Sequence, residues 1–235
     1  MNNWQPFPAT INLDATTVYL VGISINNIVL TEEHQSLLST QELAKAARFK
    51  FDIHRQRYLV FHACLRMILA RCLHTQPALL QFATGLHKKP YLNDYPQLQF
   101  NLSHSDNEAI VAITLDADIG VDIEKIKTEP MKELAKRFFS AAEFAYLNSL
   151  PPSEQIHAFY QFWAHKEAFI KATGLGLSQG LQNFTIGLQP SRLIAATDTD
   201  FSAWTLQSFH WQDGYASAFA VNKAITNVIC YHFKP

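Results

Sequence analysis

The segment "IGVDIEKIK", residues 119–127, alternates apolar and polar residues. Successive side chains of a β-strand point to opposite faces, so this spacing predicts a half-buried strand whose apolar face carries Ile119, Val121 and Ile123. Asp122 and Glu124 then share the other face, roughly 6.6 Å apart along the chain. Two carboxylates this close repel each other unless a cation lies beside them. The segment therefore predicts a binding site as well as a sheet.

A later segment, "FYQFWAHKEAFIKATGLGL", predicts a helix from about Glu154 to Thr173. At about 100° per residue, one apolar stripe collects Phe159, Phe162, Trp163, Phe169 and Ile170. Glu167 and Lys171 fall on an adjacent face. Lys166 projects into the apolar stripe, where an ammonium group is costly unless it meets an anion.

These helix residues allow two interpretations. In the first, Lys166 extends past Trp163 to water, and Glu167 and Lys171 are an ordinary surface pair one turn apart. In the second, the helix faces the strand with the two carboxylates, and its charged side chains form part of a site. The combination of strand and helix favours the second interpretation.

Three carboxylates, from Asp122, Glu124 and Glu167, without a histidine or cysteine among them, suit a hard divalent cation such as Mg²⁺. Magnesium keeps some waters and takes other ligands from phosphate oxygens. Lys166 and Lys171 would flank the metal and meet those phosphates. The hypothesis is a magnesium and phosphate site.

A second basic group lies earlier in the chain. "HKKPYL" contains Lys88 and Lys89, "NLSHS" contains Ser103 and His104, and Arg57 lies on a predicted long helix. Neither glycine-rich phosphate motif, G-x-G-x-x-G or G-x-x-x-x-G-K-[ST], occurs in the sequence. Phosphates would therefore be held by side chains.

The order of the predicted elements suggests two similar halves. The first half has a strand near residues 18–25, a helix capped by Thr40 and ending near Phe49, a helix from Asp52 to Leu73 and strands within residues 98–124. The buried stripe of the long helix is predicted at Ile53, Val60, Cys64 and Met67 or Ile68. The second half repeats helix then strands, at 154–173, 184–188, 201–211 and 215–222. We predict an α+β fold of two pseudo-twofold related halves, residues 1–118 and 119–235, each a helix on a small antiparallel sheet.

Composition restricts the partners and the location. The chain has 235 residues, with 19 Lys and Arg against 20 Asp and Glu, and a net charge of −1. No general basic field is available for nucleic acid or an acidic membrane. Three cysteines without C-x-x-C spacing indicate a reducing compartment, and no signal or membrane-spanning segment is recognised, so a cytoplasmic location is expected. The ten histidines include no H-E-x-x-H motif, which leaves a zinc hydrolase unsupported.

Several acidic residues are expected to have no chemical role. Asp116 and Asp118 are predicted to lie in a turn, and Glu108 at a solvated hairpin position.

The motifs together resemble the 4′-phosphopantetheinyl transferases of the Sfp type. The resemblance rests on "GVDIEKIK", on "FWAHKEAFIKATGLGL" and, before them, on "KKP" followed by "FNLSHS", with "AKRFFSAAEF" between the two main motifs. It covers most of residues 40–190. Members of this family move the phosphopantetheine arm of coenzyme A to a serine of an apo acyl or peptidyl carrier protein, release 3′,5′-ADP and use Mg²⁺. The family's fold implies two similar halves with the coenzyme in the cleft between them.

The resemblance also implies residue roles. Asp122, Glu124 and Glu167 are the expected metal ligands. Lys171 and His104 are expected at the pyrophosphate, Arg57 at the 3′-phosphate, and Lys89 and Ser103 at the adenosine end, with Lys88 as the alternative to Lys89.

The reaction requires charge stabilisation and a base. Lys171, Lys166 and His104 are expected to stabilise the leaving oxygen. Glu167, or a water that it orients, is the candidate base, and Glu143 is a second candidate. Phe138, Phe139 and Leu147 are a possible docking surface for the carrier, with burial as the alternative.

Two other functions stay open. One is a metal-dependent phosphohydrolase of nucleotide pyrophosphates, which would use the same residues. The other is a non-catalytic relative that binds carrier proteins. In all cases both halves lie on one chain, so a monomer is sufficient.

Overall fold

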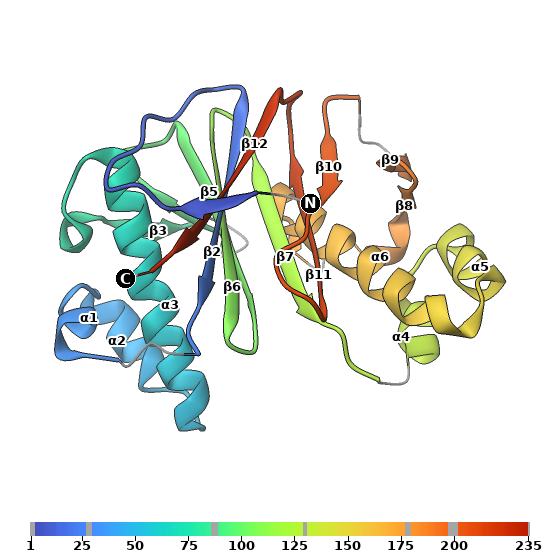
Figure 1. Cartoon of the computed structure of the whole chain (residues 1–235), viewed down its shortest axis with the longest axis horizontal. Helices are drawn as coiled ribbons and strands as arrows, with labels where there is room; N and C mark the ends of the chain where they lie inside the picture. The colour runs from blue at the N-terminus through green and yellow to red at the C-terminus, as the bar shows by residue number, and fades with distance from the viewer. Residues whose placement is uncertain are drawn as a thin grey trace.

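The computed structural model describes residues 3–26, 30–85, 89–128, 131–176, 180–196 and 202–234. Two β-sheets face each other across a shared apolar layer, and one long helix covers the outer side of each sheet (Figure 1). The succession of layers is therefore helix, sheet, sheet, helix.

The first sheet has five strands, in the order β1 (Trp4–Pro6), β12 (Asn227–Phe233), β2 (Thr17–Ser24), β6 (Glu108–Leu115) and β5 (Leu98–Ser105). β1, β12 and β2 run parallel, and the pairs β2–β6 and β6–β5 are antiparallel. Strand β2 shows how the layers are made. Tyr19 and Val21 pack in the core beneath α3 (Asp52–Leu73), whereas Val18 and Leu20 pack toward the second sheet.

The second sheet is antiparallel, in the order β10 (Thr205–Ser208), β11 (Tyr215–Val221) and β7 (Ile119–Lys125). Helix α6 (Pro152–Thr173) packs on its outer face. Gly120 of β7 makes the close approach possible, because a Cβ at this position would overlap the carbonyl oxygen of Ala168 and the amide of Ala172. Strand β7 and helix α6 are thereby held in direct contact.

Shorter elements complete the described chain. They are α1 (Glu32–Ser36), α2 (Thr40–Ala46), η1 (Pro77–Leu79), β3 (Phe82–Thr84), β4 (Pro90–Leu92), α4 (Met131–Phe138), α5 (Ala141–Ser149), η3 (Leu181–Asn183), β8 (Phe184–Leu188) and β9 (Ser191–Ala196). Helices α4 and α5 extend the second half away from the sheets (Figure 1).

The predicted α+β class is confirmed, and so is the span of α3. Three details were predicted wrongly. Ile53 is 49% exposed, because the first turn of α3 extends past the end of the sheet (Figure 1). Ser39, not Thr40, caps α2, since it pairs reciprocally with Glu42. Glu108, predicted as solvated, is 1% exposed.

The two halves share strands in a way that the sequence pattern did not indicate. Strand β12, from the last part of the chain, lies between β1 and β2 in the first sheet. The division of the chain between residues 118 and 119 remains a prediction. The two pairs of helix and sheet support it, but β12 comes from the second half of the chain and pairs within the first sheet.

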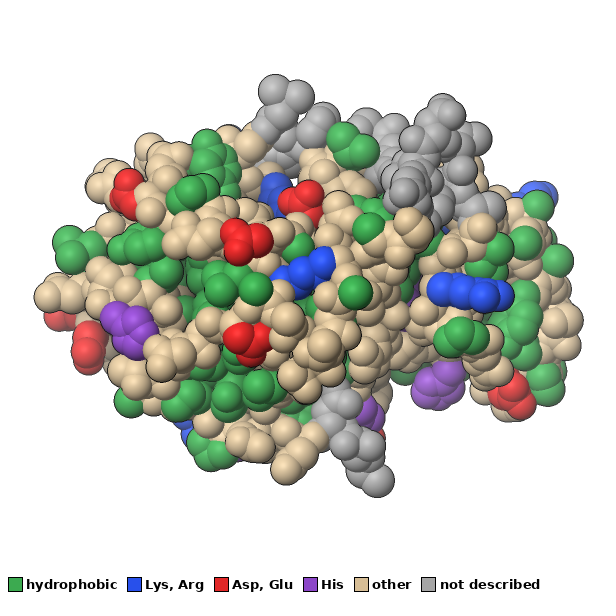
Figure 2. Space-filling model, turned by 90° about the horizontal axis from the view of Figure 1, so that it is seen from above, with side chains coloured by type: hydrophobic (Ala, Val, Ile, Leu, Met, Phe, Trp, Pro, Cys, Tyr) green, Lys and Arg blue, Asp and Glu red, His purple; other side chains and the backbone are tan. Residues whose placement is uncertain are grey.

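The upper face of the molecule has mixed charge. In Figure 2 acidic and basic side chains are interspersed among apolar ones on this face. Across the residues that the structure describes, no helix combines the length and apolar character needed to span a membrane.

Candidate active site

The two faces of β7 differ as the alternating sequence predicted. Ile119, Val121 and Ile123 are fully buried in the apolar layer between the sheets. Asp122 and Glu124 therefore lie on the face that packs against α6. The strand holds its carboxylates in place because its other side is fixed in the core.

Asp122 forms the centre of a polar cluster. Its Oδ1 accepts from Lys171 Nζ of α6 at 2.5 Å and from Ser103 Oγ of β5 at 3.0 Å. The Lys171 amine also donates to Ser103 Oγ at 2.8 Å. Three predicted residues from two strands and a helix thus meet within hydrogen-bonding distance.

Strands β5 and β7 belong to different sheets and are joined by side-chain hydrogen bonds. Asn101 Oδ1 accepts from Val121 N at 2.9 Å, and Ser105 Oγ accepts from Lys125 N at 3.0 Å. Ser105 also donates to Glu124 Oε2 at 3.3 Å. Ser105 was missed in the sequence, although it lies two residues after Ser103 and so shares its face of the strand.

Among the residues that the structure describes, the second carboxylate oxygen of Asp122 has no hydrogen-bond partner. Asp122 is 2% exposed, and its Oδ2 is buried without a hydrogen bond. Such an orphan acceptor is costly unless a cation or another donor reaches it. It is the observation in this structure that best fits a metal.

The charged forms of the neighbouring carboxylates, Glu124 and Glu167, are also disfavoured. Desolvation and the charge of Asp122 raise the pKa of Glu124 to about 7, although Lys171 opposes the shift. Desolvation and Asp122 raise the pKa of Glu167 as well. A bound cation would relieve both effects.

The three carboxylates are neighbours but do not yet form a closed coordination set. In the described part of the chain, no three His, Cys, Asp or Glu side chains stand close enough to hold a metal ion as they are. The Lys171 amine fills the position at Asp122 Oδ1 instead. The all-oxygen donor set and the orphan Oδ2 fit Mg²⁺ by their chemistry.

The predicted basic residues surround this cluster. Desolvation lowers the pKa of His104, and the charges of Lys171, His62, Arg57 and His54 lower it further. Lys171 and Arg57 therefore lie near His104 and give this region its positive charge. His54 and His62 were not singled out in the sequence, where neither belongs to a motif.

Two other predicted residues are held at the edges. Lys89 Nζ donates to the Ala172 carbonyl at 2.8 Å and lies 3.4 Å from Asp118 Oδ1, so the residue just before β4 is joined to the end of α6. His104 stacks on Phe61 of α3, with ring centroids 5.3 Å apart. Lys88, the alternative to Lys89, lies outside the described residues.

Lys166 does not join the cluster. It is 0% exposed, and its amine lies 2.9 Å from Glu143 Oε2 and donates to the carbonyls of Leu181 and Phe184, each at 2.7 Å. Burial lowers the pKa of Lys166, and the charge of Glu143 opposes this shift. The apolar surroundings of Lys166 predicted an anionic partner, and that partner is Glu143 and not a ligand. The roles expected for these two residues in the reaction do not fit this placement.

The expected docking surface is only partly available. Phe139 and Leu147 are 4% and 3% exposed and belong to the core beneath α6, so burial holds for both. Phe138 is half-buried and packs edge-on against Trp163.

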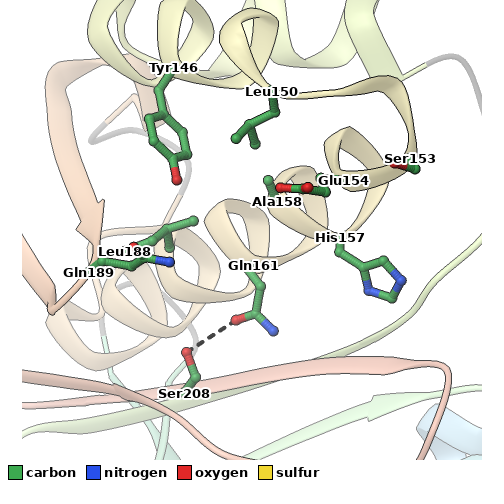
Figure 3. A pocket seen from close by; sticks show the side chains of 10 residues that line it. All are labelled: Tyr146, Leu150, Ser153, Glu154, His157, Ala158, Gln161, Leu188, Gln189 and Ser208. Carbon is green, nitrogen blue, oxygen red and sulfur yellow. Dashed lines mark hydrogen bonds between the residues drawn. The ribbon is translucent and has the colours of Figure 1, made fainter.

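A cavity in the second half is separate from the cluster. It measures 470 Å³ and lies between the beginning of α6, the end of α5 and the β8–β9 turn (Figure 3). Its floor is formed by Gln161 and Ser208, which are hydrogen-bonded at 3.1 Å. None of the predicted site residues lines it.

Comparison with known proteins identifies related chains. Residues 31–115 match the family model "4′-phosphopantetheinyl transferase, N-terminal", and residues 118–220 match the "4′-phosphopantetheinyl transferase superfamily". A solved structure, the holo-(acyl-carrier-protein) synthase of Bacillus anthracis, aligns at 22% identity and a TM-score of 0.38, over 44% of this chain and 93% of that chain. The assignment therefore rests on the sequence relatives.

Three relatives match over most of their length. The 4′-phosphopantetheinyl transferase HetI of Nostoc sp. is 35% identical over 228 residues, which cover 94% of each chain. The transferase psf-1 of Bacillus pumilus is 34% identical and covers 82% of each chain. Sfp of Bacillus subtilis is 32% identical and covers 85% of this chain and 90% of its own. The chain thus belongs to the Sfp-type 4′-phosphopantetheinyl transferases, enzymes that transfer phosphopantetheine to carrier proteins.

Proposed function

We propose that this enzyme transfers the 4′-phosphopantetheine group of coenzyme A to a serine of an apo acyl or peptidyl carrier protein, with Mg²⁺ bound by Asp122, Glu124 and Glu167. The family membership supports the transfer. The orphan Oδ2 of Asp122 and the raised carboxylate pKa values support the metal. When bound, Mg²⁺ would neutralise charge on the diphosphate of coenzyme A and orient it.

We propose the residues that hold the coenzyme from the motifs that this chain shares with its family. Lys171 and His104 bind the diphosphate, since they lie in the positive region beside Asp122. Arg57 binds the 3′-phosphate and Lys89 lies at the adenosine end. Ser103, predicted at the adenosine end, contacts Asp122 and Lys171 and therefore fits the diphosphate better. Arginine suits phosphate because its planar fork can donate two parallel hydrogen bonds.

The transfer forms one bond and breaks another. The carrier serine oxygen bonds to the phosphorus next to the pantetheine, and the bond from that phosphorus to the bridging oxygen breaks, releasing 3′,5′-ADP. Glu167 takes the serine proton, directly or through a water that it orients. Lys171 and His104 stabilise the charge that develops on the bridging oxygen.

The observation that carries the proposal is the incomplete cluster at Asp122. A carboxylate that was only structural would have both oxygens paired at 2% exposure. This one has an amine on one oxygen and a free acceptor on the other.

The test is transfer with purified components. The enzyme is incubated with coenzyme A, Mg²⁺ and a panel of apo acyl and peptidyl carriers, and intact mass is measured. We expect one carrier to gain the mass of one phosphopantetheine group, and a chelator to stop the gain. Transfer that is unchanged in the chelator contradicts the metal; no transfer to any carrier contradicts the acceptor class.

The same assay distinguishes a transferase from a phosphohydrolase. That enzyme would consume coenzyme A when every carrier is omitted, whereas a transferase would leave it intact. We further propose that one copy of the chain is sufficient and that it works in the cytoplasm. Sedimentation of the purified protein and fractionation of cells test these two points.

A further inference from the structure

The turn between β5 and β6 reaches Arg57, one of the proposed coenzyme contacts. It consists of Asp106, in the left-handed region with φ of 52°, and Asn107. Asn107 Oδ1 accepts a hydrogen bond from Arg57 Nε at 2.9 Å. The Asn107 amide thus contacts the guanidinium of Arg57 at Nε, the nitrogen attached to the aliphatic part of the side chain. The two terminal nitrogens of the guanidinium are not used in this hydrogen bond.

Asn107 is itself held by a chain of polar groups. Its Nδ2 donates to Asn26 Oδ1 at 2.8 Å, and Asn26 Nδ2 donates to Glu108 Oε1 at 3.1 Å. A guanidinium only donates and a carboxylate only accepts, so both amides between them are constrained to the same orientation. The chain therefore fixes which atom Asn107 presents to Arg57.

Glu108 anchors the far end of this chain. It is 1% exposed and also accepts from Ser24 Oγ at 2.8 Å and from Trp211 Nε1 at 2.9 Å. Ser24 belongs to β2 of the first sheet, and Trp211 lies just before β11 of the second sheet. The anchor is thus tied to both halves of the molecule.

Within the described part of the chain, the terminal nitrogens of Arg57 form no close ion pair. One lies 3.7 Å from Asp106 Oδ1, whose other oxygen pairs with Lys125 at 2.8 Å. The Arg57 side chain is 18% exposed, which leaves it accessible. Arg57 also contributes to the positive region around His104.

We infer that Asn107 is a positioning residue for coenzyme A: by holding Arg57 at Nε, it aims the terminal nitrogens at a phosphate. This inference rests on the proposed role of Arg57 at the 3′-phosphate. Without the amide, the arginine side chain samples other rotamers and pays their entropy on binding. Asn107 touches neither the reacting phosphorus nor the serine.

The experiment compares Asn107→Ala with wild type, using coenzyme A and dephospho-coenzyme A, which lacks the 3′-phosphate. We expect the KM for coenzyme A to rise about tenfold, the scale of one hydrogen bond to a charged group, with kcat unchanged. The KM for dephospho-coenzyme A should not change. Asn148→Ala, an exposed asparagine that bonds within α5, is the matched control.

A double variant makes the test specific. In an Arg57→Ala enzyme, adding Asn107→Ala should change no constant further, because the amide acts through the guanidinium. Additive losses, or equal losses with both co-substrates, would overturn the inference and leave transfer itself intact. If Arg57→Ala raises the KM equally for the two co-substrates, the phosphate role of Arg57 and the inference both fail. Absence of transfer in wild type would instead refute the proposed function.

Discussion

Helix α6 carries two lysines that each form an ion pair with a carboxylate, but the two pairs differ in how completely their polar atoms are hydrogen-bonded. Lys166 is enclosed with Glu143, each side chain 0% exposed, and its amine has three acceptors. Lys171 is 29% exposed, and its partner Asp122 keeps one oxygen without a hydrogen bond. A pair whose partners are complete serves the fold, and a pair left incomplete at an accessible edge can still bind something. Completeness of hydrogen bonding, more than burial or charge, distinguishes the two.

The largest effect should come from the open pair. Asp122→Asn keeps the size of the side chain and an acceptor for Lys171 but removes the charge, and we expect transfer to fall by roughly a hundredfold or more. Carrier mass gain over time measures it. The melting temperature should fall only slightly, because Lys171, which loses its charged partner, is 29% exposed and can be hydrated. Asp94→Asn, an exposed residue, is the control, and near-normal activity of Asp122→Asn would erase the distinction between the pairs.

The closed pair should respond in stability. Lys166→Met leaves Glu143 buried without its cation, and we expect the free energy of unfolding to fall by about 3–5 kcal/mol. Urea unfolding measures the loss. Adding Glu143→Leu should recover part of it. The protein that remains folded should transfer at close to the normal rate; a variant that unfolds normally but has lost transfer would restore a role for Lys166 in the reaction.

A third ion pair, between Glu42 of α2 and Arg66 of α3, extends the comparison to the dependence of stability on pH. Desolvation raises the pKa of Glu42, but hydrogen bonds from His62, Arg66 and Ser39 outweigh it and lower the pKa to about 2. A folded pKa below the ordinary value of 4.5 for a glutamate favours the charged, folded state, so its stabilisation is present above pH 4.5 and is lost as pH falls toward 2.

Urea unfolding between pH 6 and pH 3 tests this dependence. Glu42→Gln should remove most of the difference in stability between the two ends of that range. A slope equal to that of wild type would assign the acid sensitivity to other carboxylates.

The smallest effect concerns the metal. Mg²⁺ at a hundredfold excess over its Kd should stabilise the protein by about 2.7 kcal/mol, and a chelator should reverse the gain. Differential scanning calorimetry measures it. The response should disappear in Glu124→Gln and persist in the double variant Lys166→Met with Glu143→Leu. If both lose it, the ion binds elsewhere or the fold has changed.

The local parts of this site could be predicted from the sequence. Alternation placed Asp122 and Glu124 on one face of β7, and helical periodicity placed Glu167 and Lys171 together on α6. Both patterns have short repeats that tertiary contacts rarely overturn when the opposite face is apolar. The sequence also showed that Lys166 needed an anion.

The identity of that anion could not be predicted, because Glu143 lies on another helix and carries only the signature of a capping box. Glu108 looked like any polar residue beside a turn, and its burial depends on Trp211, which is 103 residues away in the chain. The position of β12 has the same cause. Each of these depends on long-range partners, for which a single sequence has no periodic signal.

The place of β12 has a consequence for biosynthesis. During translation, β2 emerges early and its neighbour β12 emerges only near residue 230, so one edge of β2 stays open while most of the polypeptide is made. An open apolar edge is a template for wrong pairing. Loss of residues 227–233 by a premature stop would leave that edge exposed permanently, and such a product should accumulate as aggregates even though every proposed substrate contact precedes the break.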